Sequence, residues 1–460
     1  MAASALDLRA ISANGDAAAE RDPGDARFRI SQILRFALAL MISAQLARIP
    51  VLSSTAKDAP ILLNDLLVVM VVAAGFIAAL RSQRFVIDRT AAWALAFAAI
   101  GGGSALLAMP RFNLSAFQLV FSLAYLARWL VYFGVYLVTV NFVRRADVPR
   151  VLGTLENSVL VFAGFGIIQS IFLPGFAQLV YPDSRAYVDW DPQGHRLVST
   201  FLDPNFAGAL IVLGLLLYLA RLAEGISVPW WKLAMLFAAL ILTVSRSAVL
   251  AIIAGALLIV AVRGIPRKWV RYGALITVLT LPFLPLIISY AVSFNKFAVD
   301  ASALTRVVRW LEALVVLADN PVIGVGFNTY GFVRDSYGFS NIGNASFGLD
   351  GGLLFIAVMT GGLGVLLYIA MMASTVRRCR RIWRSPAARP DERSLAVATA
   401  ACTVALIVHS LFLNSLLYPF LMEPLWVLWG LTFAVQGAAT RSSGTAGATP
   451  LRLAVIPAGG

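Results

Sequence analysis

Long apolar segments recur along almost the whole chain and restrict it to a membrane fold. Roughly twelve stretches approach the 20 apolar residues that a helix needs to cross a bilayer. The chain is 60% hydrophobic and only 13% charged, and a soluble domain of this size has no means of hiding so much apolar surface. Lipid solvates such surface, and helices satisfy their own backbone in lipid. The sequence therefore predicts an all-α polytopic membrane protein with about 12 transmembrane helices.

Basic residues indicate how these helices are oriented. The predicted spans lie near residues 33–51, 60–80, 86–108, 116–143, 151–176, 201–222, 230–244, 247–262, 271–292, 352–374, 395–414 and 417–437. Arginine and lysine are concentrated in alternate loops, near residues 81–89, 144–150, 221–232, 263–271 and 377–393. Cytoplasmic loops carry such an excess, so we expect both termini in the cytoplasm. The net charge of +14 then reflects topology, and we expect no nucleic-acid partner.

The domain organisation follows from the same pattern. Residues 1–28 are polar without the apolar core of a signal peptide, so we expect a disordered cytoplasmic tail. Residues 29–440 form one predicted transmembrane domain, followed by a flexible cytoplasmic tail at 441–460. The longer loops, 177–200 and 293–350, fall on the outer side. Cys379 and Cys402 suggest neither a disulfide nor a metal site, and we expect no cofactor.

The loop 293–350 contains a predicted amphipathic helix from Ala303 to Asp319. Apolar residues recur there at helical spacing, namely Leu304, Val307, Val308, Leu311, Leu314 and Val315. Asn320-Pro321 ends the pattern. We expect this helix to lie along the membrane surface with Arg306 and Arg309 facing a site.

Two polar segments near the outer ends of spans each have two interpretations. Ser245-Arg246-Ser247 interrupts an apolar run, either as a turn whose arginine reaches lipid headgroups or as a binding site for an anion. Asp350 directly precedes a span, either as a helix cap or as a general base.

Other polar residues in or near the apolar runs also require an explanation. Asp203 before Pro204-Asn205 is typical of a helix cap, and Arg196 and Asn205 are candidates to face an outer cavity. Arg128 and Glu156 are predicted to form a buried pair. No specific role follows for Asp65, His409 or Glu423. The sequence contains none of the glycine-rich nucleotide motifs.

Four segments follow one another along the chain: residues 196–205, Ser245-Arg246-Ser247-Ala248, Arg306 to Gly326 with its Arg-x-x-x-Trp and Asn-Pro-x-x-Gly-x-Gly pattern, and Gly361-Gly362-Leu363-Gly364. Together they resemble the O-antigen ligase and polymerase superfamily of bacterial membrane glycosyltransferases. This family includes Wzy-type polysaccharide polymerases and lipopolysaccharide O-antigen ligases. Their order matches the family, and the clear likeness covers about residues 195 to 370.

The resemblance implies a GT-C-like fold in the bacterial inner membrane and a periplasmic active site. The donor would be an undecaprenyl-diphosphate-linked oligosaccharide. Arg246 and Arg306 would stabilise the leaving diphosphate without a metal, with inversion at the sugar carbon. Substrate binding would fall to Arg196, Arg309, Asn205 and Ser245.

One departure from the family affects the predicted base and acceptor. Where the ligases carry a His-Asn pair, this chain has Asp350-Gly351. Aspartate also accepts a proton, so Asp350 would serve as base, and the change favours a polymerase of O-antigen or exopolysaccharide repeat units. A chain-length regulator and a flippase would be partners. The alternatives are a ligase that transfers glycan to lipid A-core or another acceptor, and a lipid-linked sugar flippase.

Overall fold

The computed structural model describes residues 23–43, 50–52, 61–82, 85–176, 195–264, 299–339 and 349–441. The predicted span 271–292, most of the loop 177–200 and most of both predicted tails lie outside these ranges.

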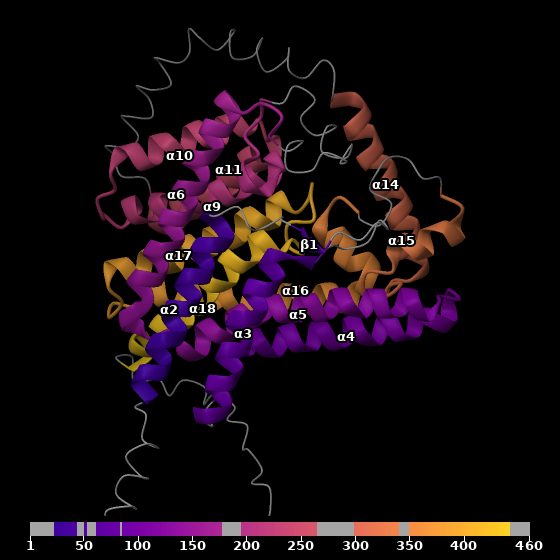
Figure 1. The fold of residues 1–460 in the computed structure, drawn as a ribbon, viewed down its shortest axis with the longest axis horizontal. Helices are drawn as coiled ribbons and strands as arrows, with labels where there is room; N and C mark the ends of the chain where they lie inside the picture. The colour runs from indigo at the N-terminus through magenta and orange to yellow at the C-terminus, as the bar shows by residue number, and fades with distance from the viewer. Residues whose placement is uncertain are drawn as a thin grey trace, which may run out of the picture.

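The described chain is built from helices (Figure 1). Their bounds are α2 Pro23–Ser43, α3 Leu63–Ser82, α4 Arg89–Arg111, α5 Ala116–Phe142, α6 Val148–Phe172, α9 Pro204–Ala223, α10 Trp230–Thr243, α11 Arg246–Arg263, α14 Val299–Asp319, α15 Tyr330–Val333, α16 Gly352–Arg384, α17 Pro390–His409 and α18 Pro419–Arg441. Short 3₁₀ turns are η2 Arg145–Asp147, η3 Ser199–Phe201 and η5 Arg334–Tyr337, and strands β1 Pro50–Leu52 and β2 Ile61–Leu62 pair antiparallel.

The prediction of an all-α polytopic membrane protein is confirmed. Among the described residues, eight helices are long and apolar enough to cross a membrane: α3, α4, α5, α6 with η2, α9, α11, α16 and α17. Each predicted span in the described ranges overlaps a helix. Two bounds differ clearly, because α2 begins at Pro23, inside the predicted tail, and α16 continues to Arg384.

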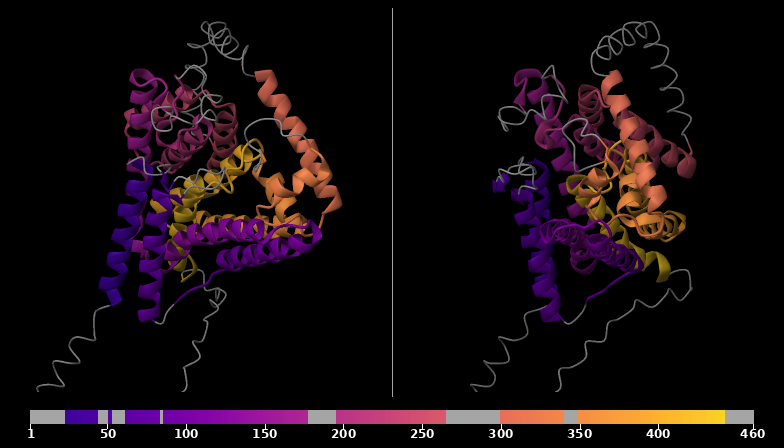
Figure 2. Two further views of the ribbon diagram at one scale, coloured as in Figure 1. Left: turned by 45° about the vertical axis from the view of Figure 1, so that its right-hand side comes forward. Right: turned by 90° about the vertical axis from the view of Figure 1, so that its right-hand side faces the viewer.

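Helices distant in sequence pack together through aromatic and small residues. Phe97 of α4, Trp129 and Phe133 of α5 and Trp426 of α18 form a continuous aromatic cluster, with ring centroids 5.2–5.9 Å apart. Helix α17 packs against α9, α11, α16 and α18, and its buried face is rich in alanine. Small residues allow the close approach of helices in lipid. Figure 2 shows α4 and α5 side by side, crossing the direction of α2 and α3.

The predicted pair of Arg128 with Glu156 is wrong. Arg128 binds both carboxylate oxygens of Asp65 at 2.7 and 2.8 Å, whereas Glu156 pairs with Arg221 at 3.0 Å. The two side chains face different neighbours, because α5 packs on α3 and α6 packs on α9. Each charge thus meets an opposite charge on an adjacent helix, which the apolar surroundings require.

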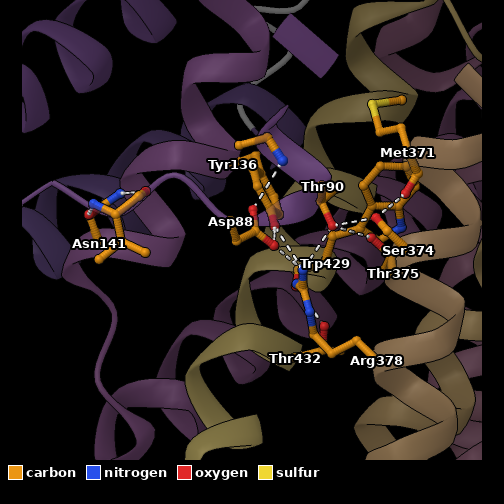
Figure 3. A network of polar contacts seen from close by, with 12 residues as sticks. Asp88, Thr90, Tyr136, Asn141, Met371, Ser374, Thr375, Arg378, Trp429 and Thr432 are labelled. Carbon is orange, nitrogen blue, oxygen red and sulfur yellow. Dashed lines mark hydrogen bonds and ion pairs between the residues drawn. The ribbon is translucent and has the colours of Figure 1, made fainter. Parts of the chain in front are cut away.

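Arg378 joins four helices through one buried polar network, shown in Figure 3. It ion-pairs with Asp88, at the start of α4, and donates to Thr90 Oγ1 at 2.8 Å. It also donates to the Tyr136 hydroxyl on α5 at 3.2 Å and the Trp429 carbonyl on α18 at 3.1 Å. The sequence placed Arg378 in a basic loop. It is only 4% exposed, because α16 continues past the predicted end of the span.

Removing Arg378 should destabilise the protein strongly. Arg378→Ala would leave Asp88 buried without its cation, and breaking a buried pair in this way costs about 3–5 kcal/mol. Thermal unfolding of the detergent-solubilised protein measures the loss. The matched control is Arg377→Ala, one residue earlier on the same helix and exposed. Equal unfolding temperatures for the two variants would contradict the structural role of the network.

Candidate functional site

Arg246 begins α11 in an exposed position. Ser245 caps the helix by accepting a bond from the amide of Ala248 at 3.3 Å. The Arg246 side chain is exposed, and the described residues offer it no hydrogen bond or ion pair. The helix macrodipole disfavours a cation at a helix N-terminus, so the charge of Arg246 does not stabilise α11. The backbone amides at the start of a helix have no partner within the helix. Such amides at the start of α11, together with the Arg246 guanidinium, suit an anion.

Arg196 holds the turn that precedes Arg246. Its Nε donates to the Thr243 carbonyl at 2.9 Å, and its Nη2 donates to the Val244 carbonyl at 3.3 Å. The last carbonyls of a helix have no partner within the helix, and a basic side chain commonly satisfies them. Arg196 therefore stabilises the end of α10 and the turn into α11.

A chain of buried hydrogen bonds links the starts of α9 and α11 to the end of α17. We call it the serine–histidine chain; its members are Asn205, Ser245, Ser247, His409 and Ser415. Successive contacts run from Asn205 Oδ1 to Ser245 Oγ at 3.0 Å, to Ser247 Oγ at 3.1 Å, to His409 Nε2 at 3.1 Å, and from His409 Nδ1 to Ser415 Oγ at 2.5 Å. Asp203 caps α9 beside this chain, as predicted.

One assignment of the hydrogens in this chain follows from the bond that Ser245 donates to Asn205. Ser245 donates its hydroxyl hydrogen to Asn205, so Ser247 must donate to Ser245. A hydroxyl has one hydrogen to give, so His409 must donate from Nε2 to Ser247. Its Nδ1 is then free to accept from Ser415. In this assignment His409 carries its hydrogen on Nε2 and accepts at Nδ1.

Arg306 and Asp350 form the second part of the site. Arg306 Nε lies 3.2 Å from Asp350 Oδ2, and each side chain is about one-third exposed (33% and 34%). Trp310, one turn further along α14, donates its indole hydrogen to the Asp350 carbonyl at 2.7 Å. The pair is therefore held in place but open to solvent on one side.

Asp350 is not a helix cap. The capping residue of α16 is Gly351, with φ of 101°, and among the described residues no side chain caps this helix. The cap interpretation is wrong, because α16 begins two residues after Asp350. The base interpretation stays a prediction.

Arg309 does not face the site. It is 9% exposed and lies on the buried side of α14 with Ala313. Its neighbours there include Tyr330 and the ion pair of Arg334 with Glu312. Burial raises the pKa of Tyr330 to about 12, against the opposing influence of Arg334 and Arg309, so its phenol stays neutral. The helical spacing predicted that Arg306 and Arg309 share one face of the helix. In the structure Arg309 is buried against the protein, whereas Arg306 is one-third exposed and binds Asp350.

The segment Asn320–Gly326 fixes α14 to α16. Its amides and carbonyls bond across to α16, with Gly326 N to Met359 O at 3.0 Å and Gly362 N to Pro321 O at 2.8 Å. Gly361 has φ of 65°, and a Cβ there would lie 2.1 Å from the Val322 carbonyl oxygen. The glycine-rich motifs thus allow two backbones to approach closely.

The residues after α17 bring the two parts of the site together. Gly352 N donates to the carbonyls of Ser410 and Leu413 at 2.7 and 2.9 Å, while His409 contacts Ser247. The last residue of α17 and the turn after it therefore contact both the start of α11, with Arg246, and the start of α16, next to Asp350. The predicted residues Arg246, Arg306, Asp350, Asn205 and Ser245 gather at this end, and Arg196 supports them.

These features define a polytopic membrane protein with exposed arginines and a carboxylate at one end of its helices. Residues 231–369 match a family model described as O-antigen ligase. This match supports the resemblance to the O-antigen ligase and polymerase superfamily that the sequence motifs indicated. The matched residues include α10, α11, α14, α15 and the first part of α16. No curated protein shows significant similarity to the chain.

His409 is the residue that sequence reasoning missed. The available signal was its position near the end of an apolar run. A polar side chain there costs free energy unless it forms a hydrogen bond, so a partner could be expected. That partner was not predictable, because Ser247 is 162 residues away.

Replacing His409 should weaken the whole end of the bundle. His409→Leu leaves the hydroxyls of Ser247 and Ser415 without their buried partner, which costs about 1–3 kcal/mol. Thermal unfolding in detergent measures the effect. His195, the other histidine of the chain, is exposed, so His195→Leu is the control and should change little. Unfolding of the His409→Leu protein at the wild-type temperature would contradict the hydrogen-bond chain.

Proposed function

We propose that the protein is a membrane glycosyltransferase that polymerises polyprenyl-diphosphate-linked oligosaccharide repeat units on the periplasmic face of the inner membrane. The observation that carries this proposal is the open Arg306–Asp350 pair, held at the same end of the helices as Arg246, which has no partner in the described part of the chain. The match to the O-antigen ligase family supports glycosyl transfer over transport.

The arginines would act on the donor. Arg246 has no protein partner to displace among the described residues, so it is ready to bind the diphosphate. Arg306 would exchange Asp350 for a phosphate oxygen, since guanidinium binds phosphate strongly. Together they would stabilise the charge that develops on the leaving group, without requiring a metal.

Asp350 would act on the acceptor. Once Arg306 turns to the diphosphate, the carboxylate can accept the proton of a sugar hydroxyl on a second lipid-linked unit. The hydroxyl oxygen forms the new bond to the anomeric carbon as the bond to the diphosphate oxygen breaks, so the anomeric centre inverts. The bond electrons leave with the diphosphate, and the proton goes to Asp350.

The remaining predicted binding residues take other parts in this proposal. Asn205 and Ser245 position the turn that carries Arg246, through the bond between them. Arg196 and Arg309 stabilise the surrounding backbone and packing, since one bonds carbonyls and the other is buried. A chain-length regulator and a flippase remain proposed partners of the pathway.

The second candidate is a ligase that transfers the finished glycan to lipid A-core. The description of the matching family favours it. The donor chemistry would be the same, and only the acceptor would differ.

Arg246→Ala should reduce polymer synthesis by about 10²–10³, the effect of losing one group that stabilises an oxyanion. The readout is polysaccharide length and yield in a deletion strain at matched membrane levels of protein. Arg377→Ala, an exposed arginine away from the site, is the control for loss of surface charge. If Arg246→Ala makes long chains at the wild-type yield, Arg246 does not bind the donor.

Asp350→Asn should reduce synthesis by about 10²–10⁴, the usual contribution of a general base. Asparagine keeps an oxygen for Arg306 but accepts no proton. Stability should hardly change, because an exposed ion pair contributes only about 0–1 kcal/mol. Asp335→Asn, an exposed aspartate following α15, is the matched control. Wild-type activity in Asp350→Asn would rule out the base role.

A further inference from the structure

Helix α14 exposes its apolar side. Its opposite side packs inward and includes Arg309, Ala313 and Val316, each no more than 9% exposed. The open residues follow a helical spacing and are each 46–59% exposed: Val307, Leu311, Leu314 and Val315. We call them the α14 stripe. Helix α14 thus buries a charged residue and exposes leucines. A helix at a water-facing surface shows the opposite pattern.

The α14 stripe continues onto a membrane-spanning helix. Val322, just after α14, is 65% exposed, and its carbonyl accepts from the amide of Leu363 on α16 at 3.2 Å. From there an exposed apolar face runs along α16 through Leu363, Leu366 and Ile369. Helix α16 is long and apolar enough to cross a membrane, so lipid is the expected neighbour of this face. The left view of Figure 2 shows α14 along an edge of the molecule.

We propose that the α14 stripe inserts into the phospholipid bilayer at the boundary between headgroups and acyl chains. An amphipathic helix in that position buries its apolar face about 5–10 Å into the boundary. The continuity with the lipid-facing side of α16 selects lipid as the occupant. The backbone bond between Val322 and Leu363 places the segment after α14 beside the kink of α16 at Gly361.

The position of the site follows from this insertion. Arg306 directly precedes Val307 of the stripe and holds Asp350, so the pair would lie at the depth of the lipid phosphates. A diphosphate on a membrane lipid lies at the same depth. This consequence for substrate rests on the proposed function, whereas the insertion itself does not.

Fluorescent labels on single cysteines test the insertion. Cys379 and Cys402 are fully buried, so Leu311→Cys and Leu314→Cys supply accessible thiols for an environment-sensitive dye. Ser336→Cys, exposed and off the stripe, is the control. The labelled proteins are placed in nanodiscs of phosphatidylethanolamine and phosphatidylglycerol that contain lipids with nitroxides at shallow or deep positions. Aqueous iodide is the second quencher.

The proposal predicts at least about twofold stronger quenching of positions 311 and 314 by shallow than by deep nitroxides, as expected for an interfacial helix. Iodide should quench only position 336. Three results would overturn the proposal: iodide quenching of 311 and 314 equal to that of 336, stronger quenching by the deep nitroxides, or protection from all quenchers, which would indicate a protein partner. Glycan synthesis does not enter this readout, so failure of the proposed function leaves it unaffected.

Discussion

A charge in the apolar interior of a membrane protein costs several kcal/mol unless it meets a partner, and the ion pairs of this chain satisfy that constraint. Arg128 meets Asp65, Glu156 meets Arg221, and Arg378 meets Asp88. Each pair joins two helices and so fixes which helices are neighbours. A charged side chain that forms no such buried pair therefore needs a different explanation for its position.

Arg246 is such a group, and the structure around it is held by the hydrogen bonds of Arg196 and of the serine–histidine chain. The serine–histidine chain runs through buried side chains to the turn after α17, and that turn also binds the start of α16. A rigid support with an open guanidinium and an open ion pair suits a ligand that carries its own negative charge. In the proposed mechanism the two arginines would act on the donor and the carboxylate on the acceptor.

Hydropathy predicted the helices because lipid imposes a length of about 20 residues, and helix caps at Asp203 and Ser245 could be recognised from local sequence. The partners of Arg128 and Glu156 were not predictable, since they depend on which helices pack together. Arg309 shows the same limit: its spacing from Arg306 suggested a shared face, but packing against α16 and the ion pair of Glu312 with Arg334 set the rotation of α14. The motifs identified Arg246, Arg306 and Asp350 from sequence. That the end of α17 and the turn after it hold the helices carrying these residues together could be seen only in the structure.

The most direct measurement uses purified protein in proteoliposomes with one lipid-diphosphate-linked repeat unit and no lipid A-core. The account predicts glycans longer than one repeat unit, because a second lipid-linked unit is the acceptor. Single units that persist until lipid A-core is added, and then appear on it, would contradict the polymerase and show that the protein is a ligase.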